Sequence, residues 1–429
     1  MDEAYQISGE AGSLDKGACA HYYAAVAHSN APAASGRMRG ARRPGKLALL
    51  LGTLTALGPL SIDMYLPGFQ AIARDLAARP AQVQATLAVF FVALGIGQAF
   101  YGPVSDRYGR RRPLCFGLAL YVLASAGCAL ALSIQTLIVW RFAQAIGGCA
   151  GMVIARAVVR DRFDEREAAQ FFSLLMLVTG LAPILAPSVG GQIVVVFSWR
   201  VIFWTLAGFG LFGFGTVAIL LPESLPPERR IQGGVGEALR IYARLLRDRA
   251  FMRYALSGAL VISGMFAYIF GSPFVFMQIY GVRPERFGWI FGSIALGLIS
   301  ASQLNRFLLA RVAGARILSR ALMVTAAAGI VLLIMAWTGT GGLPGLLVPL
   351  FAYIASLGFV LPNVIASALA SQGRNAGTAS ALMGTLQFGA GASVGMLLGA
   401  LGNGTAVPMA ALIAACGLSA LVVHRLAAP

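Results

Sequence analysis

Two charged residues stand out because they fall inside apolar stretches of this 429-residue chain. Among its 16 acidic residues, Asp63 is the one that lies clearly within such a stretch, and Arg141 lies within another. A carboxylate in the interior of a membrane is costly, so its presence there indicates a function. Burial disfavours the charged form of a carboxyl group and a nearby cation favours it. A carboxyl group under both influences can exchange a proton near neutral pH.

Asp63 and Arg141 are expected at matching depths. Asp63 lies four residues before the outer end of the first stretch, and Arg141 lies about four residues after the outer start of the fourth. The rise of an α-helix then places both roughly 6 Å below the outer boundary. We predict that Asp63 carries an exchanged proton and that Arg141 tunes the pKa of Asp63 and competes for its carboxylate. The alternative is a fixed ion pair that only holds two helices together.

Membrane-spanning helices must position these two residues. The chain is 58% hydrophobic and only 11% charged, against roughly 25% charged in soluble domains. Its apolar runs are about twenty residues long, the length that crosses roughly 30 Å of hydrocarbon as a helix. We predict an all-α membrane protein with twelve spans, at residues 47–67, 83–103, 114–133, 137–157, 170–195, 201–221, 252–274, 288–308, 317–337, 343–366, 378–399 and 405–425.

The basic residues predict the orientation. The chain has 33 Lys and Arg and a net charge of +17. Five of these cations lie in loops on one side of the predicted membrane, two lie within spans, and the other 26 lie on the opposite side. This is the positive-inside pattern, so we predict a multi-pass protein of the cell inner (cytoplasmic) membrane with both termini in the cytoplasm. Because topology accounts for the charge, we expect no nucleic-acid partner.

The spans divide into two sets of six. Residues 1–45 are polar and rich in Ala, Gly and Ser, and we expect a disordered cytoplasmic tail there. Residues 46–221 and 252–429 are predicted to form two six-helix bundles, the arrangement of many secondary transporters built from repeated halves. The linker at 222–251 carries a basic amphipathic helix. We expect this helix on the cytoplasmic lipid surface, with an apolar face formed by Leu239, Tyr242 and Leu246.

The sequence predicts no metal, no cofactor and no enzyme. We place all three histidines, His21, His28 and His424, outside the membrane. The pattern GxxxxGK at residues 40–46 is followed by Leu47 instead of Ser or Thr, so we expect no nucleotide site. An enzyme would need a nucleophile and a base in one constellation, and spans with a single carboxylate and no histidine do not provide it. The proton gradient is then the expected source of energy.

The loop after the second span carries the most specific motif, GPVSDRYGRRRP at residues 102–113. We expect its glycine at 102 to permit close helix approach and its arginines to anchor the loop to anionic head groups. The segment resembles the loop 2–3 signature of the major facilitator superfamily, with Val104 in place of Leu, and a degenerate copy occurs at residues 305–311. The resemblance implies a gating role for Gly102, Asp106, Arg107, Gly109 and Arg110.

Further segments resemble the Bcr/CflA drug-resistance family within that superfamily. They are PLSIDMYLP at residues 59–67, SPF at 272–274, PN at 362–363 and AGTASA at 376–381. The resemblance implies proton-driven export of small drug-like compounds by a monomer.

The fifth span carries a variant of the antiporter motif of such transporters. Ala182 and Ala186 replace two of its glycines. Two prolines four residues apart weaken the backbone hydrogen bonds of a helix and bend it. The resemblance assigns the motif to Pro183, Pro187, Gly190 and Gly191.

The substrate is expected in a central pocket of adaptable, mostly apolar character. Its candidate lining residues, each of which can equally be ordinary helix packing, are Asp63, Tyr65, Arg141, Tyr268, Asn363, Gln387 and Phe388. Arg156, near the inner end of the fourth span, can simply extend to the membrane interface, and we assign it no role. The alternative function is import or facilitated transport of a polar metabolite, which would require more polar and charged residues in the pocket.

Overall fold

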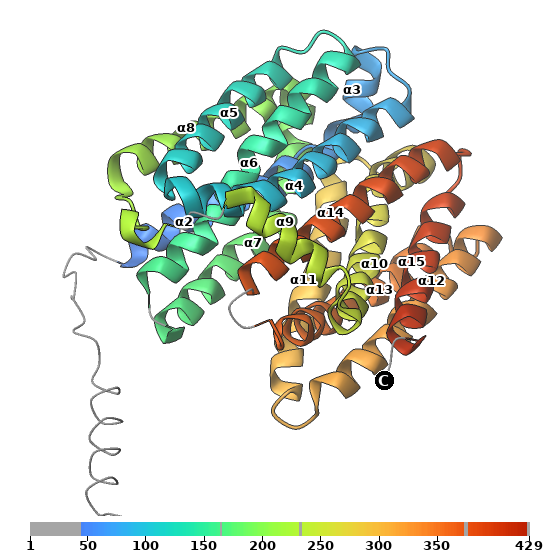
Figure 1. Cartoon of the computed structure of the whole chain (residues 1–429). Helices are drawn as coiled ribbons and strands as arrows, with labels where there is room; N and C mark the ends of the chain where they lie inside the picture. The colour runs from blue at the N-terminus through green and yellow to red at the C-terminus, as the bar shows by residue number, and fades with distance from the viewer. Residues whose placement is uncertain (1–43, 164, 231–233, 373–375, 427–429) are drawn as a thin grey trace, which may run out of the picture. The chain divides into compact units, whose positions relative to one another are not determined.

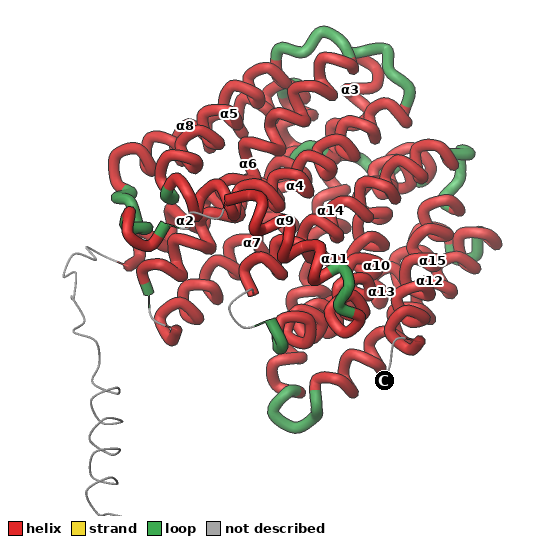
Figure 2. Tube along the Cα trace, in the orientation of Figure 1, coloured by secondary structure: helices red, strands yellow, loops and turns green. Residues whose placement is uncertain are grey.

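The computed structural model describes residues 44–163, 165–230, 234–372 and 376–426. Within these ranges helices and short connections make up the chain, and no strand occurs (Figure 2). The predicted tail at residues 1–45 lies outside the described residues as far as residue 43. The all-α prediction is confirmed for the ranges given above.

Twelve long helices correspond to the twelve predicted spans (Figure 1). Over their described residues, ten of them are long and apolar enough to cross a membrane. The six that we call the first half are α2 (Pro44–Asp63), α4 (Pro80–Tyr108), α5 (Arg111–Ala129), α6 (Ile134–Arg162), α7 (Glu165–Val196) and α8 (Trp199–Leu220). The six that we call the second half are α10 (Arg249–Ser272), α11 (Pro284–Leu308), α12 (Gly314–Thr338), α13 (Gly342–Leu369), α14 (Ala376–Leu401) and α15 (Val407–Leu426).

Short elements connect some of these helices. A 3-10 turn, η1 (Leu66–Gly68), and the helix α3 (Phe69–Asp75) follow α2. The linker between the halves contains the 3-10 turn η2 (Pro227–Arg229) and the helix α9 (Gly234–Leu245). A π-helical segment, η3 (Pro273–Ile279), extends α10.

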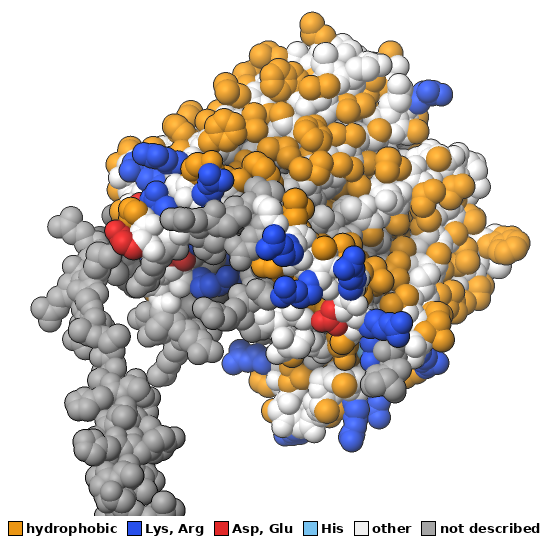
Figure 3. All heavy atoms as spheres, in the orientation of Figure 1, with side chains coloured by type: hydrophobic (Ala, Val, Ile, Leu, Met, Phe, Trp, Pro, Cys, Tyr) orange, Lys and Arg blue, Asp and Glu red, His pale blue; other side chains and the backbone are white. Residues whose placement is uncertain are grey.

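The helices pack mainly within their own half. In the first half α6 packs against α4 and α5, and α5 also packs against α8. In the second half α10 packs against α13, α14 and α15, while α12 packs against α13 and α15. The halves meet where α4 packs against α14 and where α7 packs against α11. Hydrophobic side chains cover most of the face seen in Figure 3, as expected for a surface in contact with lipid, and Lys and Arg gather along one edge of it.

The first helix ends earlier than the predicted span. The apolar stretch continues to residue 67, but α2 ends at Asp63 and the chain turns into η1. Pro67 explains this, because a proline has no N–H for the carbonyl four residues before it and its ring clashes with that carbonyl, which here belongs to Asp63. Asp63 is therefore the last residue of a helix and not a residue within one.

The linker helix α9 lies against protein, which corrects the prediction that its apolar face rests on lipid. It crosses α4 and α14 (Figure 1) and packs against both. Leu245 is buried, Ile241 and Tyr242 are half-buried, and the Tyr242 hydroxyl donates to the carbonyl of Ala99. The predicted members Leu239 and Leu246 are exposed instead. The hydrophobic pattern predicted the helix but not the surface that it packs against, because residues that face other helices and residues that face lipid are both apolar.

Candidate functional site

Asp63 is buried without a partner. Its exposed fraction is 4%, and its carboxylate forms no hydrogen bond or ion pair with any described residue. It lies close enough to Tyr268 of α10 for the two side chains to interact electrostatically. Tyr268 is 2% exposed, its hydroxyl also lacks a hydrogen-bond partner, and its ring stacks on Phe291 with the centroids 5.1 Å apart. An acid from the first half and a phenol from the second half thus interact electrostatically, and both are buried without hydrogen bonds to described residues.

Arg141 is enclosed within the first half. Its exposed fraction is 0%, and its Nη1 donates to the carbonyl of Ser61 at 3.1 Å and to Oε1 of Gln144 at 2.7 Å. The central carbon of its guanidinium lies 4.1 Å from the ring centroid of Phe90 and 4.6 Å from that of Tyr65. Ser61 is in the last turn of α2, where carbonyl groups lack helical partners and cations are favoured. Arg141 therefore caps the helix that ends at Asp63.

The predicted contact between Asp63 and Arg141 is not present. No ion pair or hydrogen bond joins them in the described part of the chain, and Nε and Nη2 of Arg141 are buried without partners. Side chains of residues two positions apart in an α-helix point in directions about 200° apart around the helix axis. The Ser61 side chain bonds Tyr121 within the first half. The Asp63 side chain therefore projects to the opposite side of α2, where it interacts with Tyr268 of the second half. The prediction matched the two residues in depth but had no information about direction around the helix.

Tyr65 does not point into a pocket, contrary to the prediction. It is fully buried in the first half, where its hydroxyl pairs with Thr86 at 2.7 Å and its ring packs against Phe69 and Phe203. A neighbouring pair, Ser61 and Tyr121, is also joined by a hydrogen bond of 2.7 Å between their hydroxyl groups. We missed this pair, although the position of Ser61 two residues before Asp63 could have drawn attention to it.

The other substrate candidates lie apart from one another. Asn363 of α13 donates from Nδ2 to Oδ1 of Asn305 at 2.9 Å and to the carbonyl of Phe359, so it serves packing within the second half. Gln387 of α14 faces Gly258 of α10. Gly258 lies ten residues before Tyr268, about 15 Å along the helix. The structure therefore does not bring the seven predicted substrate residues together.

Phe388 belongs to an aromatic cluster that spans the two halves. Its ring packs against Phe91 of α4, with centroids 5.6 Å apart, and stacks on Phe266 of α10 at 5.8 Å. Phe91 also contacts Phe266 and Phe270, at 4.4 and 5.2 Å. The sequence offered little to identify Phe91, Phe266 and Phe270, because phenylalanine is common throughout the spans.

Arg156 and Arg160 lie on one face of α6. It is exposed on α6, and its Nε donates to the carbonyl of Met152 at 3.0 Å. Arg160 lies one turn further along on the same face. Nη1 of Arg160 lies 3.2 Å from the place that a Cβ atom on Gly377 of α14 would take. At its Arg160 end, this face of α6 therefore lies near the start of α14.

Two glycines of the antiporter motif permit backbone contact between helices. A Cβ atom on Gly190 would lie 2.2 Å from the carbonyl oxygen of Met64, just after α2, and one on Gly191 would lie 2.4 Å from that of Pro284, at the start of α11. Any larger side chain would force these helices apart. The prolines at 183 and 187 lie within α7, which continues through both.

The loop after α4 is held by an ionic clamp centred on Arg110. Its Nε donates to Asp161 of α6 at 2.8 Å, and its Nη1 donates to Asp106 and to the hydroxyl of Ser105. Burial lowers the pKa of Arg110, but the hydrogen bonds and charges of Asp161 and Asp106 raise it by a larger amount. The net shift of the pKa is therefore upward. We refer to Asp106, Arg110 and Asp161 as the ionic clamp. Asp161 was not predicted, although it lies in a basic segment at the end of a span.

Two glycines of the same loop differ from expectation. A Cβ atom on Gly102 would meet no described atom within 4 Å, so this residue does not provide close helix approach. Gly109 has φ +88°, which favours glycine, and a Cβ atom there would lie 2.5 Å from the Glu223 carboxylate. Gly109 is therefore the position where the loop requires glycine. Arg107 is exposed and lies over the ring of Tyr108 at 5.4 Å.

No metal site is evident in the part of the chain that the structure describes, where His, Cys, Asp and Glu do not group in threes. The structure describes one of the three histidines. His424 is buried in the last turn of α15, a candidate span, where its Nε2 pairs with the hydroxyl of Ser319. It is thus a packing residue at the end of a membrane helix.

Comparison with known proteins identifies the family. The family model of the Major Facilitator Superfamily matches residues 51–396. The uncharacterized MFS-type transporter YdgK of Bacillus subtilis (strain 168) is 42% identical over 372 residues, 86% of this chain and 91% of that protein. A bicyclomycin resistance protein homolog of Haemophilus influenzae is 32% identical over 368 residues, 86% of this chain and 92% of that protein. The multidrug resistance protein MdtL of Escherichia coli is 29% identical over 382 residues, 88% and 94% of the two chains.

Solved structures share the fold. The xylose transporter XylE from E. coli, in a partially occluded inward-open conformation, matches with a TM-score of 0.70 and 14% identity, over 90% of this chain and 98% of that one. A peptide transporter POT matches with a TM-score of 0.72 and 15% identity, over 90% and 94%. These identities are low, so the likeness concerns the fold alone. The family model and the relatives show that the chain belongs to the major facilitator superfamily and to its Bcr/CflA branch.

Proposed function

We propose that this transporter exports small drug-like compounds across the cytoplasmic membrane in exchange for protons. The observation that carries the proposal is the Asp63 carboxyl group, which is buried without a partner beside a phenol of the other half. An isolated carboxylate is unstable in such a place, so binding of a proton or of a substrate donor is favoured. The names of the Haemophilus and E. coli relatives refer to drug resistance, which supports a drug-like substrate.

The two halves, residues 46–221 and 252–429, would move against each other around this site. Asp63 and Tyr268 belong to different halves, and so do the aromatic residues Phe91 and Phe388. A change of the contacts between halves would therefore change the surroundings of the carboxyl group. This is the coupling that alternating access requires, since proton and substrate must be exposed to one side at a time.

The proposed orientation places both termini in the cytoplasm. The excess of Lys and Arg at the end that contains the ionic clamp supports it through the positive-inside rule. We propose that one chain is sufficient for transport, with the gating role assigned to the loop at residues 102–110 and no cofactor beyond the proton gradient.

A pH-gradient assay in inverted membrane vesicles tests the proposal. Respiration acidifies the vesicle lumen, and addition of a transported drug should make the lumen more alkaline. Asp63→Asn should abolish this response across a panel of drugs while leaving expression unchanged. Asp75→Asn, which makes the same chemical change at the surface, is the matched control and should retain the response. Undiminished proton-coupled transport by Asp63→Asn would refute the proposal.

Transport of a polar metabolite is the second candidate function. Arg156 supports it, because this exposed cation shares one face of α6 with Arg160, which lies near the start of α14 in the second half. A cation there would favour an anionic or strongly polar substrate. If the drug panel gives no response in vesicles but labelled polar metabolites accumulate, and Arg156→Gln stops that accumulation, the second candidate replaces the first.

A further inference from the structure

Two cavities share a wall at the arginine-rich end of the first half. One cavity, of about 480 Å³, lies between the start of α5, the end of α8 and the linker. The other, of about 420 Å³, runs between α4 and α5 and also touches α6. Both volumes fall within the roughly 300–1,000 Å³ of typical small-molecule sites. Arg112 lines both cavities, so the two adjoin at this side chain.

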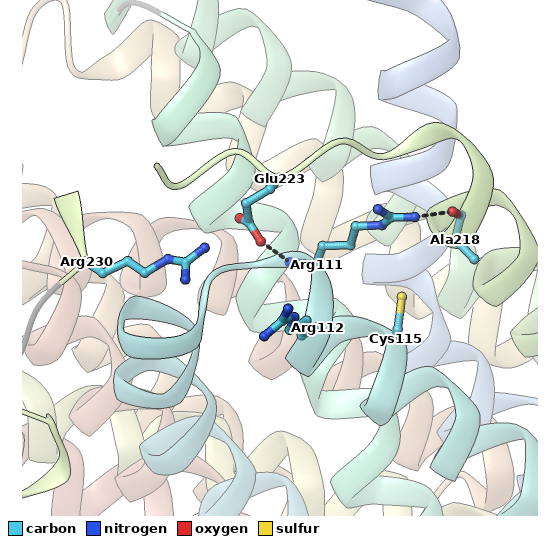
Figure 4. A pocket seen from close by; sticks show the side chains of 6 residues that line it. All are labelled: Arg111, Arg112, Cys115, Ala218, Glu223 and Arg230. Carbon is cyan, nitrogen blue, oxygen red and sulfur yellow. Dashed lines mark hydrogen bonds between the residues drawn. The ribbon is translucent and has the colours of Figure 1, made fainter. Parts of the chain in front are cut away.

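The first cavity, which we call the arginine pocket, has an excess of positive charge. Figure 4 shows the side chains of Arg111, Arg112 and Arg230 around it, with the single carboxylate of Glu223 among them. Among the described residues, no hydrogen bond involves the Arg112 side chain, and Nε of Arg230 is buried without a partner. Three guanidinium groups against one carboxylate leave an excess of two positive charges.

The carboxylate of Glu223 is already occupied. It accepts hydrogen bonds from the backbone N–H groups of Arg110 at 2.8 Å and Arg111 at 3.2 Å, and from those of Ser224 and Leu225. Burial raises its pKa, but these four backbone groups lower it by more. Glu223 therefore holds the start of α5, and as one ionised carboxylate it offsets only one of the three guanidinium charges.

The second cavity, which we call the apolar groove, opens among exposed hydrophobic side chains. Phe100 of α4 is 53% exposed and Phe116 of α5 is 68% exposed, and both line it. Along α4 the lining residues extend from Ile96 to Tyr108, which is about 18 Å by helical rise. One leaflet of the hydrocarbon core is about 15 Å thick. The groove thus has the length and character that fit a lipid acyl chain.

We propose that the arginine pocket and the apolar groove together bind one anionic phospholipid, with its phosphate in the pocket and an acyl chain in the groove. Guanidinium groups bind phosphate through paired, charge-assisted hydrogen bonds. Anionic lipids of the cytoplasmic leaflet are attracted to clustered Lys and Arg. A zwitterionic head group would bring its own cation to the pocket and leave the positive excess in place. Arg112 belongs to α5 and Arg230 to the linker, so the lipid would join the first half to the segment that leads to the second.

Native mass spectrometry of the full-length protein tests the proposal. The probes are phosphatidylglycerol, phosphatidylethanolamine and inorganic phosphate, each added to delipidated protein in detergent. Phosphatidylglycerol should bind, and the double variant R112Q/R230Q should bind it about 30-fold more weakly, from about 1 kcal/mol for each arginine. The matched control R240Q/R244Q removes two exposed arginines of α9 and should stay within about twofold of the wild type, since these side chains do not line either cavity.

Further measurements distinguish a bound phospholipid from bound inorganic phosphate. Val104→Trp fills the groove and should weaken phosphatidylglycerol binding without changing the pocket. Equal binding of phosphatidylethanolamine, unchanged binding in R112Q/R230Q, or unchanged binding in Val104→Trp would each overturn the proposal. Inorganic phosphate that binds as tightly as the lipid would show a site for free phosphate and would also overturn it.

A second readout avoids any change to the arginines. Cys115 lines the arginine pocket and is half-buried, whereas Cys128, Cys149 and Cys416 are buried. In a Cys19→Ser background, phosphatidylglycerol should slow the labelling of Cys115 by a polar maleimide, and phosphatidylethanolamine should not. Labelling at the same rate with either lipid contradicts the proposal, even if R112Q/R230Q fails to fold.

Discussion

The arginine-rich ends of the two halves are held together by different chemistry. In the first half, Arg110 joins the ends of α4 and α6 through Asp106 and Asp161. In the second half, the ends of α11 and α13 are joined by the neutral amides of Asn305 and Asn363. Loss of one partner leaves a buried charge in the first case and only an unmet hydrogen bond in the second. The degenerate sequence copy at residues 305–311 thus contributes to an uncharged counterpart of the ionic clamp.

The same contrast extends through both halves. In the sequence from residue 249 to the end, Glu285 is the single acidic residue. All the ion pairs found among the described residues belong to the first half, as does the buried Asp63. The second half contributes Tyr268 and most of the aromatic cluster. We infer a division of labour in which the first half carries the charges and the second half presents the phenolic and aromatic surface to them.

The largest expected effect on stability comes from breaking the ionic clamp. Arg110→Gln should destabilise the purified protein by about 3 kcal/mol, because it leaves Asp106 and Asp161 close together without a cation. Thermal unfolding in detergent measures the change. Arg107→Gln removes an exposed arginine from the same loop and should cost less than about 0.5 kcal/mol. Equal effects of the two substitutions would contradict the ionic role of Arg110.

A smaller effect is expected from the amide pair of the second half. Asn363→Leu should cost about 1–3 kcal/mol, since it leaves the buried Asn305 amide without its partner. The double variant N305L/N363L should recover much of that loss because no unmet polar group remains. A double-mutant cycle of thermal unfolding free energies tests this. Strictly additive losses would show that the two amides do not act as a pair.

The smallest effect concerns the end of the first half opposite to the ionic clamp, where Arg200 pairs with Asp75. The hydrogen bond from Arg200 is the main cause that holds the pKa of Asp75 below 3.8. A folded pKa below the unfolded one means that the pair stabilises the protein above about pH 4 and that the contribution disappears as pH falls through the folded pKa. Asp75→Asn should cost at most about 1 kcal/mol at pH 7. The difference from wild type should shrink as the pH falls below about 4 and vanish below the folded pKa of Asp75; a difference that stays constant over this range would contradict this account.

Much of the fold could be predicted because hydropathy and basic residues report directly on the membrane. All twelve spans were located, and the clamp loop was identified by its motif. The end of α2 at Asp63 was missed because the apolar run continues as far as Pro67, whereas the effect of this proline ends the helix four residues earlier. The pairing of Asp63 with Arg141 was wrong because sequence spacing gives depth in the membrane, whereas contact also depends on direction around each helix. Tyr65 was misplaced for the same reason.

The partners of α9 could not be predicted for a different reason. An apolar face at helical spacing indicates that something covers it, but lipid and neighbouring helices provide the same environment for Leu245 and Ile241. The long-range contacts that decide between them, to α4 and α14, join segments more than a hundred residues apart. No local pattern contains that information.

At Gly190 and Gly191, the backbone of α7 touches the backbones of the segments beside it. Side chains at an interface can adapt to small displacements, but two main chains in contact have no such compliance. A partial opening here would lose the contact without admitting a layer of water. Separation should therefore be a two-state event. Single-molecule fluorescence across this interface should accordingly record long dwells at two distances joined by abrupt steps, and not a continuous drift.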